Sequence, residues 1–280
     1  MKIIRLLSLP IVLMTLNGCN KSPTIKIILL AGQSNMEGHD SPWGNLTDET
    51  INEYRLGHDN VKINYNCTYE KNYEGGVANT SNGEFVDVDF GQGRNKKLFG
   101  PEIGVAAYLG KHDSNQQYYL IKSCEGSSSL AVQWAEDGSC YQTFVEDVNA
   151  SINFFKEKNL NFQITAFMWM QGEHDADPED RANHYKERML GLIDRINSTF
   201  KDYVPSYGIS LIDAGITTDG MWKYYEKINQ AKKEIVASND KYRYVADSET
   251  LPKIDPGYHY SPESYLKLGE RFAEEYLSIK

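Results

Sequence analysis

The segment ITAFMWM, residues 164–170, contains no charged side chain and does not alternate between apolar and polar positions. A strand with one face in water alternates, whereas a strand covered on both faces by helices does not. Four further aliphatic, aromatic or β-branched runs indicate strands, at 24–31, 118–121, 206–211 and 242–246. Together these runs predict a mainly parallel sheet that is buried on both faces.

Stretches with helical character separate the predicted strands. Pro101 stands where the first turn of a helix tolerates proline, and Gly110 ends the same stretch. The helical stretches lie at 101–110, 144–158, 178–200, 221–237 and 262–277. Strands alternating with helices form βαβ units. The predicted fold class is therefore α/β, a three-layer α/β/α sandwich with a five-stranded, mainly parallel sheet.

The segment 41–97 interrupts this rhythm, because it is rich in Asn, Gly, Tyr and Asp and shows little periodicity. We interpret it as a long insert in a single domain that spans residues 24–280, and connections of that length are usually functional. Its aromatic side chains could stack on sugar rings or simply pack the insert. They are Trp43, Tyr54, Tyr65, Tyr69, Tyr73, Phe85 and Phe90.

The first eighteen residues have the pattern of an export signal. Lys2 and Arg5 precede an apolar run at 6–16 that is too short to cross a bilayer as a mature helix. The run closes with Leu-Asn-Gly-Cys, which resembles the lipobox of a bacterial lipoprotein, so we expect Cys19 to be lipidated after removal of 1–18. The expected location is the periplasm or cell surface of a bacterium, with membrane contact only through this anchor.

Removal of the signal leaves 27 basic and 39 acidic residues, a formal charge of −12. This excess of acidic residues argues against a nucleic-acid partner and favours an uncharged or weakly charged substrate.

Cys67, Cys124 and Cys140 remain besides Cys19. An oxidising compartment permits a disulfide, and Cys124–Cys140 is the pair we favour, with buried free thiols as the alternative. The cysteine spacings do not resemble a zinc site.

The chain ILLAGQSNMEG, 28–38, runs a buried strand directly into a polar turn. Ligands of parallel sheets bind beyond the carboxyl ends of the strands, and Gly32 permits a tight turn there. Ser34 therefore has the position of a nucleophile, although a serine that caps a helix is an equally ordinary reading.

A nucleophilic serine needs a base, usually a histidine that a carboxylate orients. His259 lies just before the last helical stretch, and Asp255 precedes it by four residues. His39–Asp40 and His58–Asp59 could ligate a metal, but no third ligand recurs at a suitable spacing. We therefore expect no metal and no cofactor.

Donors for an oxyanion hole follow two other strands. Gly126 can expose a backbone N–H in KSCEGSSSLAVQW, 122–134, and Gln171 carries an amide donor in WMQGEHDA, 169–176. Either segment alone is also explained as an ordinary βα turn. Their coincidence with Ser34 and His259 favours a hydrolytic site.

Four segments carry a resemblance to the SGNH-hydrolase superfamily, whose fold is flavodoxin-like. Within it the sequence is similar to the group that contains sialate O-acetylesterases and the acetylxylan esterases of carbohydrate esterase family 6. The segments are GQSNM at 32–36, GPEIGVAAYL at 100–109, KSCEGSSSLAVQW with WMQGEHDA, and HYSPESYLKLGERFA at 259–273. They occur in the family's order and span nearly the whole mature chain.

The resemblance implies a serine esterase that removes acetyl groups from acetylated carbohydrates. Ser34 would be the nucleophile and His259 the base, and the Ser34 N–H, the Gly126 N–H and the Gln171 amide would form the oxyanion hole. Asp255 stands four residues before His259, where the superfamily usually has three. Glu173 or Asp175 therefore remains an alternative acid, and a Ser-His dyad is a further possibility.

Three other functions stay open. Glu173 and Asp175, two residues apart, could form a glycosidase pair, but this reading leaves Ser34 and His259 unexplained. The altered Asp-to-His spacing would also fit an inactive, glycan-binding surface lipoprotein. A lipid or thioester hydrolase of the same superfamily is the third possibility, and the polar segment 41–97 argues against it. Xylan, another acetylated glycan and an acetylated sialic acid are all compatible with the sequence.

Overall fold

The computed structural model describes residues 24–68, 78–254 and 257–279. The five predicted strands are present as β1 (Ile25–Gly32), β5 (Tyr118–Glu125), β6 (Phe162–Met170), β7 (Ser210–Ala214) and β8 (Tyr242–Val245). They run parallel in the order β5-β1-β6-β7-β8. This is the flavodoxin-like order, with the direction of winding reversing at β1.

The sheet is larger than the five strands predicted from the sequence. It has eight strands, in the order β3-β2-β5-β1-β6-β7-β8, with β4 paired to β2. The additional strands are β2 (Val61–Thr68), β3 (Asn79–Thr80) and β4 (Val86–Asp87). All three come from the segment 41–97. That segment extends the sheet, because β2 lies parallel to β5 along its whole length.

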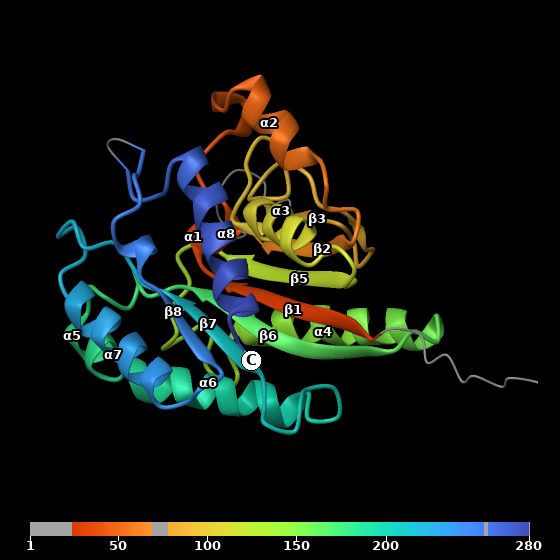
Figure 1. Cartoon of the computed structure of the whole chain (residues 1–280). Coiled ribbons are helices and arrows are strands. Elements are labelled where there is room, and N and C mark those ends of the chain that lie inside the picture. The colour runs from red at the N-terminus through yellow and green to blue at the C-terminus, as the bar shows by residue number, and fades with distance from the viewer. Residues whose placement is uncertain (1–23, 69–77, 255–256, 280) are drawn as a thin grey trace, which may run out of the picture.

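Helices cover both faces of the sheet, as Figure 1 shows, with α3 and α8 on one side and α4 and α6 on the other. The longer helices are α2 (Asp48–Arg55), α3 (Glu102–His112), α4 (Ser139–Glu157), α6 (Tyr185–Thr199), α7 (Tyr225–Ala237) and α8 (Pro262–Leu277). The short ones are α1 (Ser34–Glu37), α5 (Glu179–Asn183), η1 (Trp43–Asn45) and η2 (Asp247–Glu249). This is the predicted α/β/α sandwich.

The centre of the sheet is apolar on both faces. The last seven residues of β6 are all buried, and so are seven of the eight residues of β1. Burial on both faces explains why these strands do not alternate in sequence. No helix in the described ranges is long and apolar enough to span a bilayer.

The predicted disulfide between Cys124 and Cys140 is not formed. Cys67, Cys124 and Cys140 are buried free thiols. The Sγ of Cys124 lies 3.8 Å from the carbonyl oxygen of Leu30, while that of Cys140 lies 3.5 Å from a carboxylate oxygen of Glu125. Burial raises the pKa of all three thiols, which keeps them protonated and unreactive.

Candidate active site

Ser34 lies at the carboxyl end of β1, where the winding of the sheet reverses. Gly32 makes the turn possible, because its φ is +148° and a Cβ there would come 2.0 Å from the carbonyl oxygen of Met170. The same oxygen accepts a hydrogen bond of 3.0 Å from the Gln33 N–H. The chain then enters α1, whose first residue is Ser34. The geometry of β1 and β6 therefore fixes the serine at the edge of the sheet.

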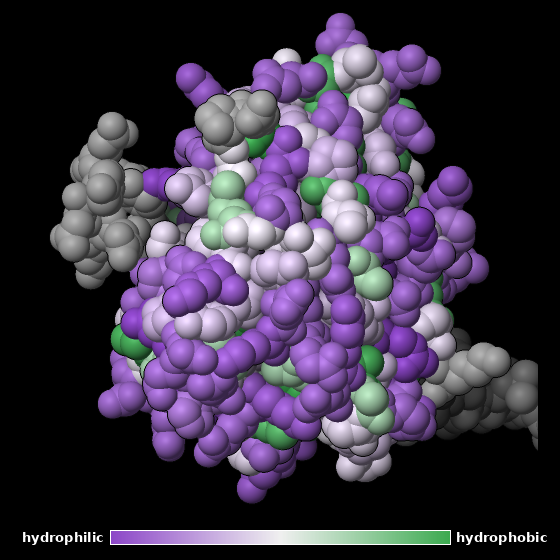
Figure 2. Space-filling view, turned by 90° about the vertical axis from the view of Figure 1, so that its left-hand side faces the viewer, coloured by the Kyte–Doolittle hydropathy of each residue, from purple (hydrophilic) through white to green (hydrophobic). Residues whose placement is uncertain are grey.

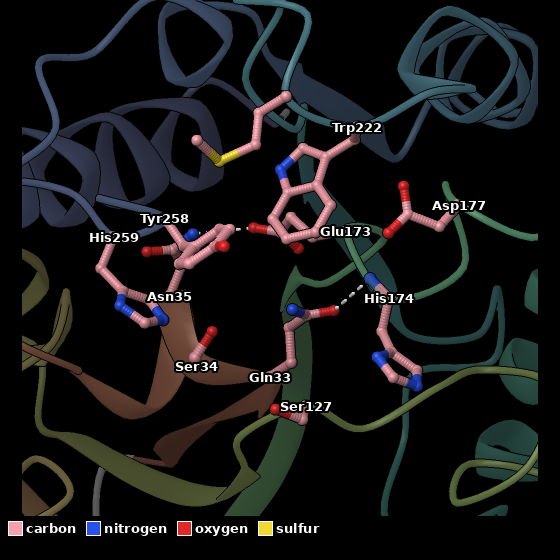
Figure 3. A pocket seen from close by; sticks show the side chains of 11 residues that line it. Gln33, Ser34, Asn35, Ser127, Glu173, His174, Asp177, Trp222, Tyr258 and His259 are labelled. Carbon is pink, nitrogen blue, oxygen red and sulfur yellow. Dashed lines mark hydrogen bonds between the residues drawn. The ribbon is translucent and has the colours of Figure 1, made fainter. Parts of the chain in front are cut away.

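Ser34 and His259 line one cavity of about 490 Å³ at this edge. Figure 3 shows the His259 ring beside the Ser34 hydroxyl, with Gln33, Glu173 and Trp222 on the other walls. The complete lining is Gln33, Ser34, Asn35, Ser127, Glu173, His174, Asp177, Met221, Trp222, Tyr258 and His259. Two side chains that are 225 positions apart in sequence thus meet in one cavity, as the sequence predicts.

The carboxylate that contacts His259 is that of Asp40. The Nδ1 of His259 donates a hydrogen bond of 2.7 Å to Asp40 Oδ2, which leaves Nε2 to face the cavity. Asp40 has a φ of +56°, in the left-handed region that aspartate tolerates better than most residues. Asp255 lies outside the described residues. Asp40 is a residue that sequence reasoning placed only among possible metal ligands.

A second histidine continues this chain of contacts. The Nδ1 of His39 lies 3.3 Å from Asp40 Oδ1, and the rings of His39 and His259 lie side by side with their centroids 4.4 Å apart and their planes inclined by 33°. The Arg94 guanidinium donates to the His39 ring from the other side. Arg94, His39, Asp40 and His259 therefore form a connected row that ends at the cavity.

The charges in this row are set by burial and by one another. Burial lowers the pKa of His39 to about 4, with further lowering by His259 and Arg94. Burial also lowers the pKa of His259, partly opposed by the Asp40 carboxylate. Burial opposes ionisation of Asp40, but the two imidazoles outweigh it and hold the pKa of Asp40 below its usual value. At neutral pH the row contains neutral imidazoles beside an ionised Asp40, the state that a general base requires.

The donor atoms of His39, Asp40 and His259 all lie within 4.8 Å of one another, which is close enough to hold a metal ion. His259 is the third possible ligand beside His39 and Asp40, which the spacing of residues in the sequence does not reveal. The positive charge of Arg94, which donates to His39, opposes a cation at this point. The contacts are therefore those of a hydrogen-bonded row.

The sequence predicts that the Gln171 amide donates to the oxyanion, but the structure does not place Gln171 at the cavity wall. Gln171 is fully buried, and its Nε2 donates to Ser128 O at 3.1 Å and to Asp175 Oδ2 at 2.5 Å. Both amide hydrogens are thereby used. Its side-chain oxygen accepts from the Tyr185 hydroxyl.

Gly126 is also absent from the cavity lining. Its backbone lies against the buried Glu37, so that a Cβ at Gly126 would come 3.0 Å from Glu37 Oε2. The next residue, Ser127, lines the cavity instead and has a φ of +58°.

Gln33, the glutamine of the GQSN motif, lines the cavity at the position where sequence reasoning expected other donors. Its Oε1 accepts from the N–H groups of Gly172 and His174 at 3.4 and 3.3 Å. Its Nε2 then points into the cavity (Figure 3). The motif itself contained this signal, because an amide that follows Gly32 directly must also lie at the end of β1.

The two alternative acids have separate places. Asp175 is fully buried and accepts from the Ser129 hydroxyl at 2.8 Å and the Leu130 N–H at 2.7 Å, so it holds the loop after β5. Glu173 accepts from Asn35 Nδ2 at 2.7 Å and lines the cavity. Only one of the two faces the cavity, so they do not form the glycosidase pair considered above.

The fold resembles those of several solved structures. A protein from Arabidopsis thaliana is 20% identical, with a TM-score of 0.67, over 91% of this chain and 99% of that one. NanS is 15% identical, with a TM-score of 0.62, over 92% and 98%. A carbohydrate acetylesterase from Xanthomonas citri is 14% identical, with a TM-score of 0.55, over 90% and 56%. No curated protein matches the chain.

A family model described as "carbohydrate esterase, sialic acid-specific acetylesterase" matches residues 24–278. The match includes the strand end with Ser34, the His259 loop and all the secondary structure between them. It agrees with the resemblance to SGNH-type carbohydrate esterases. The chain therefore belongs to the family of carbohydrate esterases that this model describes, and it is an esterase that acts on acetylated carbohydrates.

Proposed function

We propose that this protein is a carbohydrate O-acetylesterase that forms an acyl-enzyme on Ser34. The observation that carries the proposal is the shared cavity of Ser34 and His259, together with the 2.7 Å contact between His259 Nδ1 and Asp40. A serine, a histidine and an orienting carboxylate are the parts that acyl transfer through a serine requires.

In the first half of the reaction, His259 Nε2 takes the Ser34 proton while Ser34 Oγ bonds to the acetyl carbon. The carbonyl oxygen becomes an oxyanion, and we assign the Ser34 N–H and the Gln33 amide, both in the cavity at the end of β1, as its donors. The bond from the acetyl carbon to the sugar oxygen then breaks, and His259 returns its proton to that oxygen. The sugar leaves with a free hydroxyl group.

In the second half, His259 takes a proton from water, and the oxygen of that water bonds to the acetyl carbon. The bond to Ser34 Oγ breaks, and Ser34 regains its proton from His259. Acetate leaves, and the site returns to its starting state. Asp40 remains ionised throughout and holds the imidazole with its Nδ1 protonated.

The face that carries the site argues for a polar substrate. The carboxyl ends of the strands face the viewer in Figure 2, where hydrophilic residues dominate and apolar residues are scattered. A lipid hydrolase needs an apolar surface to hold an acyl chain. This supports an acetylated carbohydrate over a lipid or thioester substrate.

Ser34→Ala tests the proposal. We expect this variant to lose roughly 10³-fold or more in acetate release from acetylated sugars and from p-nitrophenyl acetate, because no other nucleophile replaces the hydroxyl. Ser238→Ala, at an exposed serine on the C-terminal end of α7, is the matched control and should keep the wild-type rate. Undiminished acetate release by Ser34→Ala would overturn the proposal.

We also propose that the protein is exported and lipidated at Cys19, on the sequence pattern of 1–19. β1 begins at the amino edge of the sheet, whereas Ser34 lies at the carboxyl edge. An anchor attached ahead of β1 would therefore leave the cavity on the end of the molecule away from the anchor.

A further inference from the structure

Two buried polar atoms of the cavity wall have no hydrogen-bond partner within the described ranges. They are Glu173 Oε2 and Trp222 Nε1, and both residues line the cavity that holds Ser34. A buried polar atom without a partner destabilises the folded state, and few such atoms remain in native structures. Two of them in one cavity, one an acceptor and the other a donor, point to a ligand that carries hydroxyl groups.

Glu173 is held in place for such a contact. Only 2% of the residue is exposed, and its Oε1 accepts from Asn35 Nδ2 at 2.7 Å. Asn35 in turn accepts from the Tyr260 N–H and the Tyr265 hydroxyl. The carboxyl group is therefore held in place through Oε1, whereas Oε2 accepts no hydrogen bond from any described residue that would hold it.

Trp222 belongs to the loop between β7 and α7, and this loop is tied to the loop of Glu173. The Tyr224 N–H donates to the carbonyl of Ala176 at 2.7 Å, and the Lys223 N–H donates to Asp177 Oδ1 at 3.4 Å. The indole ring and the carboxyl group therefore form adjoining parts of one wall (Figure 3).

The ring of Trp222 also lies beside the exposed ring of Tyr258, with centroids 5.6 Å apart and planes inclined by 38°. Aromatic faces carry partial negative charge, and the C–H groups of a pyranose carry partial positive charge. The two rings form an apolar surface at the cavity mouth on which a sugar ring can lie.

We propose that Glu173 and Trp222, with Tyr258, form the subsite for a neutral acetylated pyranose. A sugar hydroxyl donates to Glu173 Oε2, and a sugar oxygen accepts from Trp222 Nε1, while the ring lies against the aromatic side chains. This inference rests on the proposed acetylesterase function and names the class of sugar that the site accepts.

The charge of the cavity selects against a carboxylated sugar such as a sialic acid. Two acidic side chains, Glu173 and Asp177, line it, and no lysine or arginine of the described residues does. Lys253, which lies close to His259, is paired with Asp219. A sugar carboxylate held among these groups meets like charge, and the two lysines whose charges act on Glu173, Lys232 and Lys253, are already paired with Asp213 and Asp219. The specificity of this chain thus differs from the one named in the description of its family.

The first test compares variants that remove one hydrogen bond each. Trp222→Phe keeps an aromatic ring without the N–H, and Glu173→Gln keeps an acceptor for Asn35. We expect kcat/KM for acetate release from methyl O-acetyl-glucopyranosides to fall by about fivefold to tenfold more than kcat/KM for p-nitrophenyl acetate, which has no sugar to bind. Trp43→Phe, at a tryptophan that does not line the cavity and whose Nε1 donates to Lys96 O, is the matched control and should change neither value.

The second test uses the wild-type protein, so it does not depend on how a variant folds. Acetate release is measured from the methyl glycoside of 9-O-acetyl-N-acetylneuraminic acid and from its C1 carboxamide, which differ in one charge. We expect the carboxamide to react roughly tenfold faster. In Glu173→Gln the ratio of the carboxamide rate to the free-acid rate should move towards one.

The outcomes separate this inference from the function on which it rests. If wild type releases acetate but both variants lose activity equally towards sugars and p-nitrophenyl acetate, the subsite is wrong and the esterase stands. If the free acid reacts as fast as the carboxamide, selection against charge is wrong. If wild type releases acetate from none of these compounds, the proposed function itself fails.

Discussion

At the scale of single residues, the position of Asp40 decides how His259 is oriented. Its carboxylate contacts the imidazoles of both His259 and His39. An imidazole that donates from Nδ1 to a carboxylate has Nε2 free to accept the proton of a nearby hydroxyl group. The orienting acid thus follows the serine in sequence by six positions, and the base comes from the other end of the chain.

Asp40→Asn tests this role. We expect kcat to fall by roughly 10²–10⁴, because an asparagine can hold the wrong tautomer of the imidazole. The Asp40 carboxylate raises the pKa of His259, so its removal should lower that pKa further. The acidic limb of the pH profile of kcat/KM should then move to lower pH.

The control for Asp40→Asn is Asp59→Asn, in the other His-Asp pair of the sequence. It should leave the rate and the pH profile unchanged, since Asp59 does not line the cavity. An Asp40→Asn variant with the wild-type rate and pH profile would exclude Asp40 as the orienting acid.

Glu37 is a second residue whose environment has a measurable consequence. It is fully buried, and within the described ranges neither carboxyl oxygen has a hydrogen-bond partner with normal geometry, although the Gly126 backbone lies close to it. Burial raises the pKa of Glu37 to about 8, against the lowering effects of Arg94 and Lys122. In the unfolded chain the same group titrates near its ordinary value of 4.5.

Between pH 5 and 8 the folded state therefore holds a proton on Glu37 that the unfolded state has lost. Stability should fall as pH rises through this range, by roughly 1 kcal/mol per pH unit from this group. Glu37→Gln removes the titration, so we expect its stability advantage over wild type in urea unfolding to grow from pH 5 to pH 8. Glu157→Gln, at an exposed position of α4, should show no such trend, and a constant offset for Glu37→Gln would contradict the assignment.

At the scale of elements, Lys122 of β5 joins three parts of the molecule around the site. Its ammonium group donates to Glu102 Oε2 at 2.7 Å, to the Glu37 carbonyl at 2.9 Å and to the Gln92 carbonyl at 3.0 Å. These partners belong to α3, to α1 and to the segment 41–97. Lys122 and Glu102 are both fully buried, so each depends on the other for its charge to be tolerated.

Lys122→Met should destabilise the protein by about 3–5 kcal/mol, because Glu102 is left buried without its partner. The double variant Lys122→Met/Glu102→Leu should recover part of this loss, since it removes both charges. Equilibrium unfolding in urea measures both changes. A loss below about 1 kcal/mol for Lys122→Met, or no recovery in the double variant, would contradict this account of the pair.

The sequence correctly predicts the elements whose residue pattern within the element itself shows what they are. Strands such as β1 and β6 are buried on both faces and read as continuous apolar runs. The strand β2 was missed because Asn64 and Asn66 resemble loop residues. Both asparagines bond to α4, Asn64 to Ser151 and Asn66 to Asp147. The apolar residues at every second position, VKINYNC, were the signal that could have found it.

The same reasoning explains which site residues the sequence locates. Ser34 and His259 stand next to local features, the end of a strand and the start of a helix, so their positions follow from short motifs. Asp40 meets His259 across 219 positions, and only the tertiary fold brings them together. Gln171 was misplaced because its motif gives its distance from β6 and not the direction of its side chain.

At the scale of the whole molecule, the site lies where the winding of the sheet reverses, beyond the carboxyl end of β1. Neighbouring strands β5 and β6 lead away from β1 on opposite sides, which opens room for a cavity at that edge. Loops after β1, β5, β6 and β7 and the segment before α8 all contribute lining residues. A cavity built by so many elements requires the complete fold.

The most direct measurement is active-site labelling with a fluorophosphonate probe, followed by mass spectrometry of the digested protein. We expect one adduct, on the peptide that contains Ser34, with slower labelling in Asp40→Asn and none in Ser34→Ala. Labelling of another residue, or equal labelling of wild type and Ser34→Ala, would contradict the assignment of Ser34 as the nucleophile. Glycan binding by a wild-type protein that takes no label would instead indicate a binding protein without esterase activity.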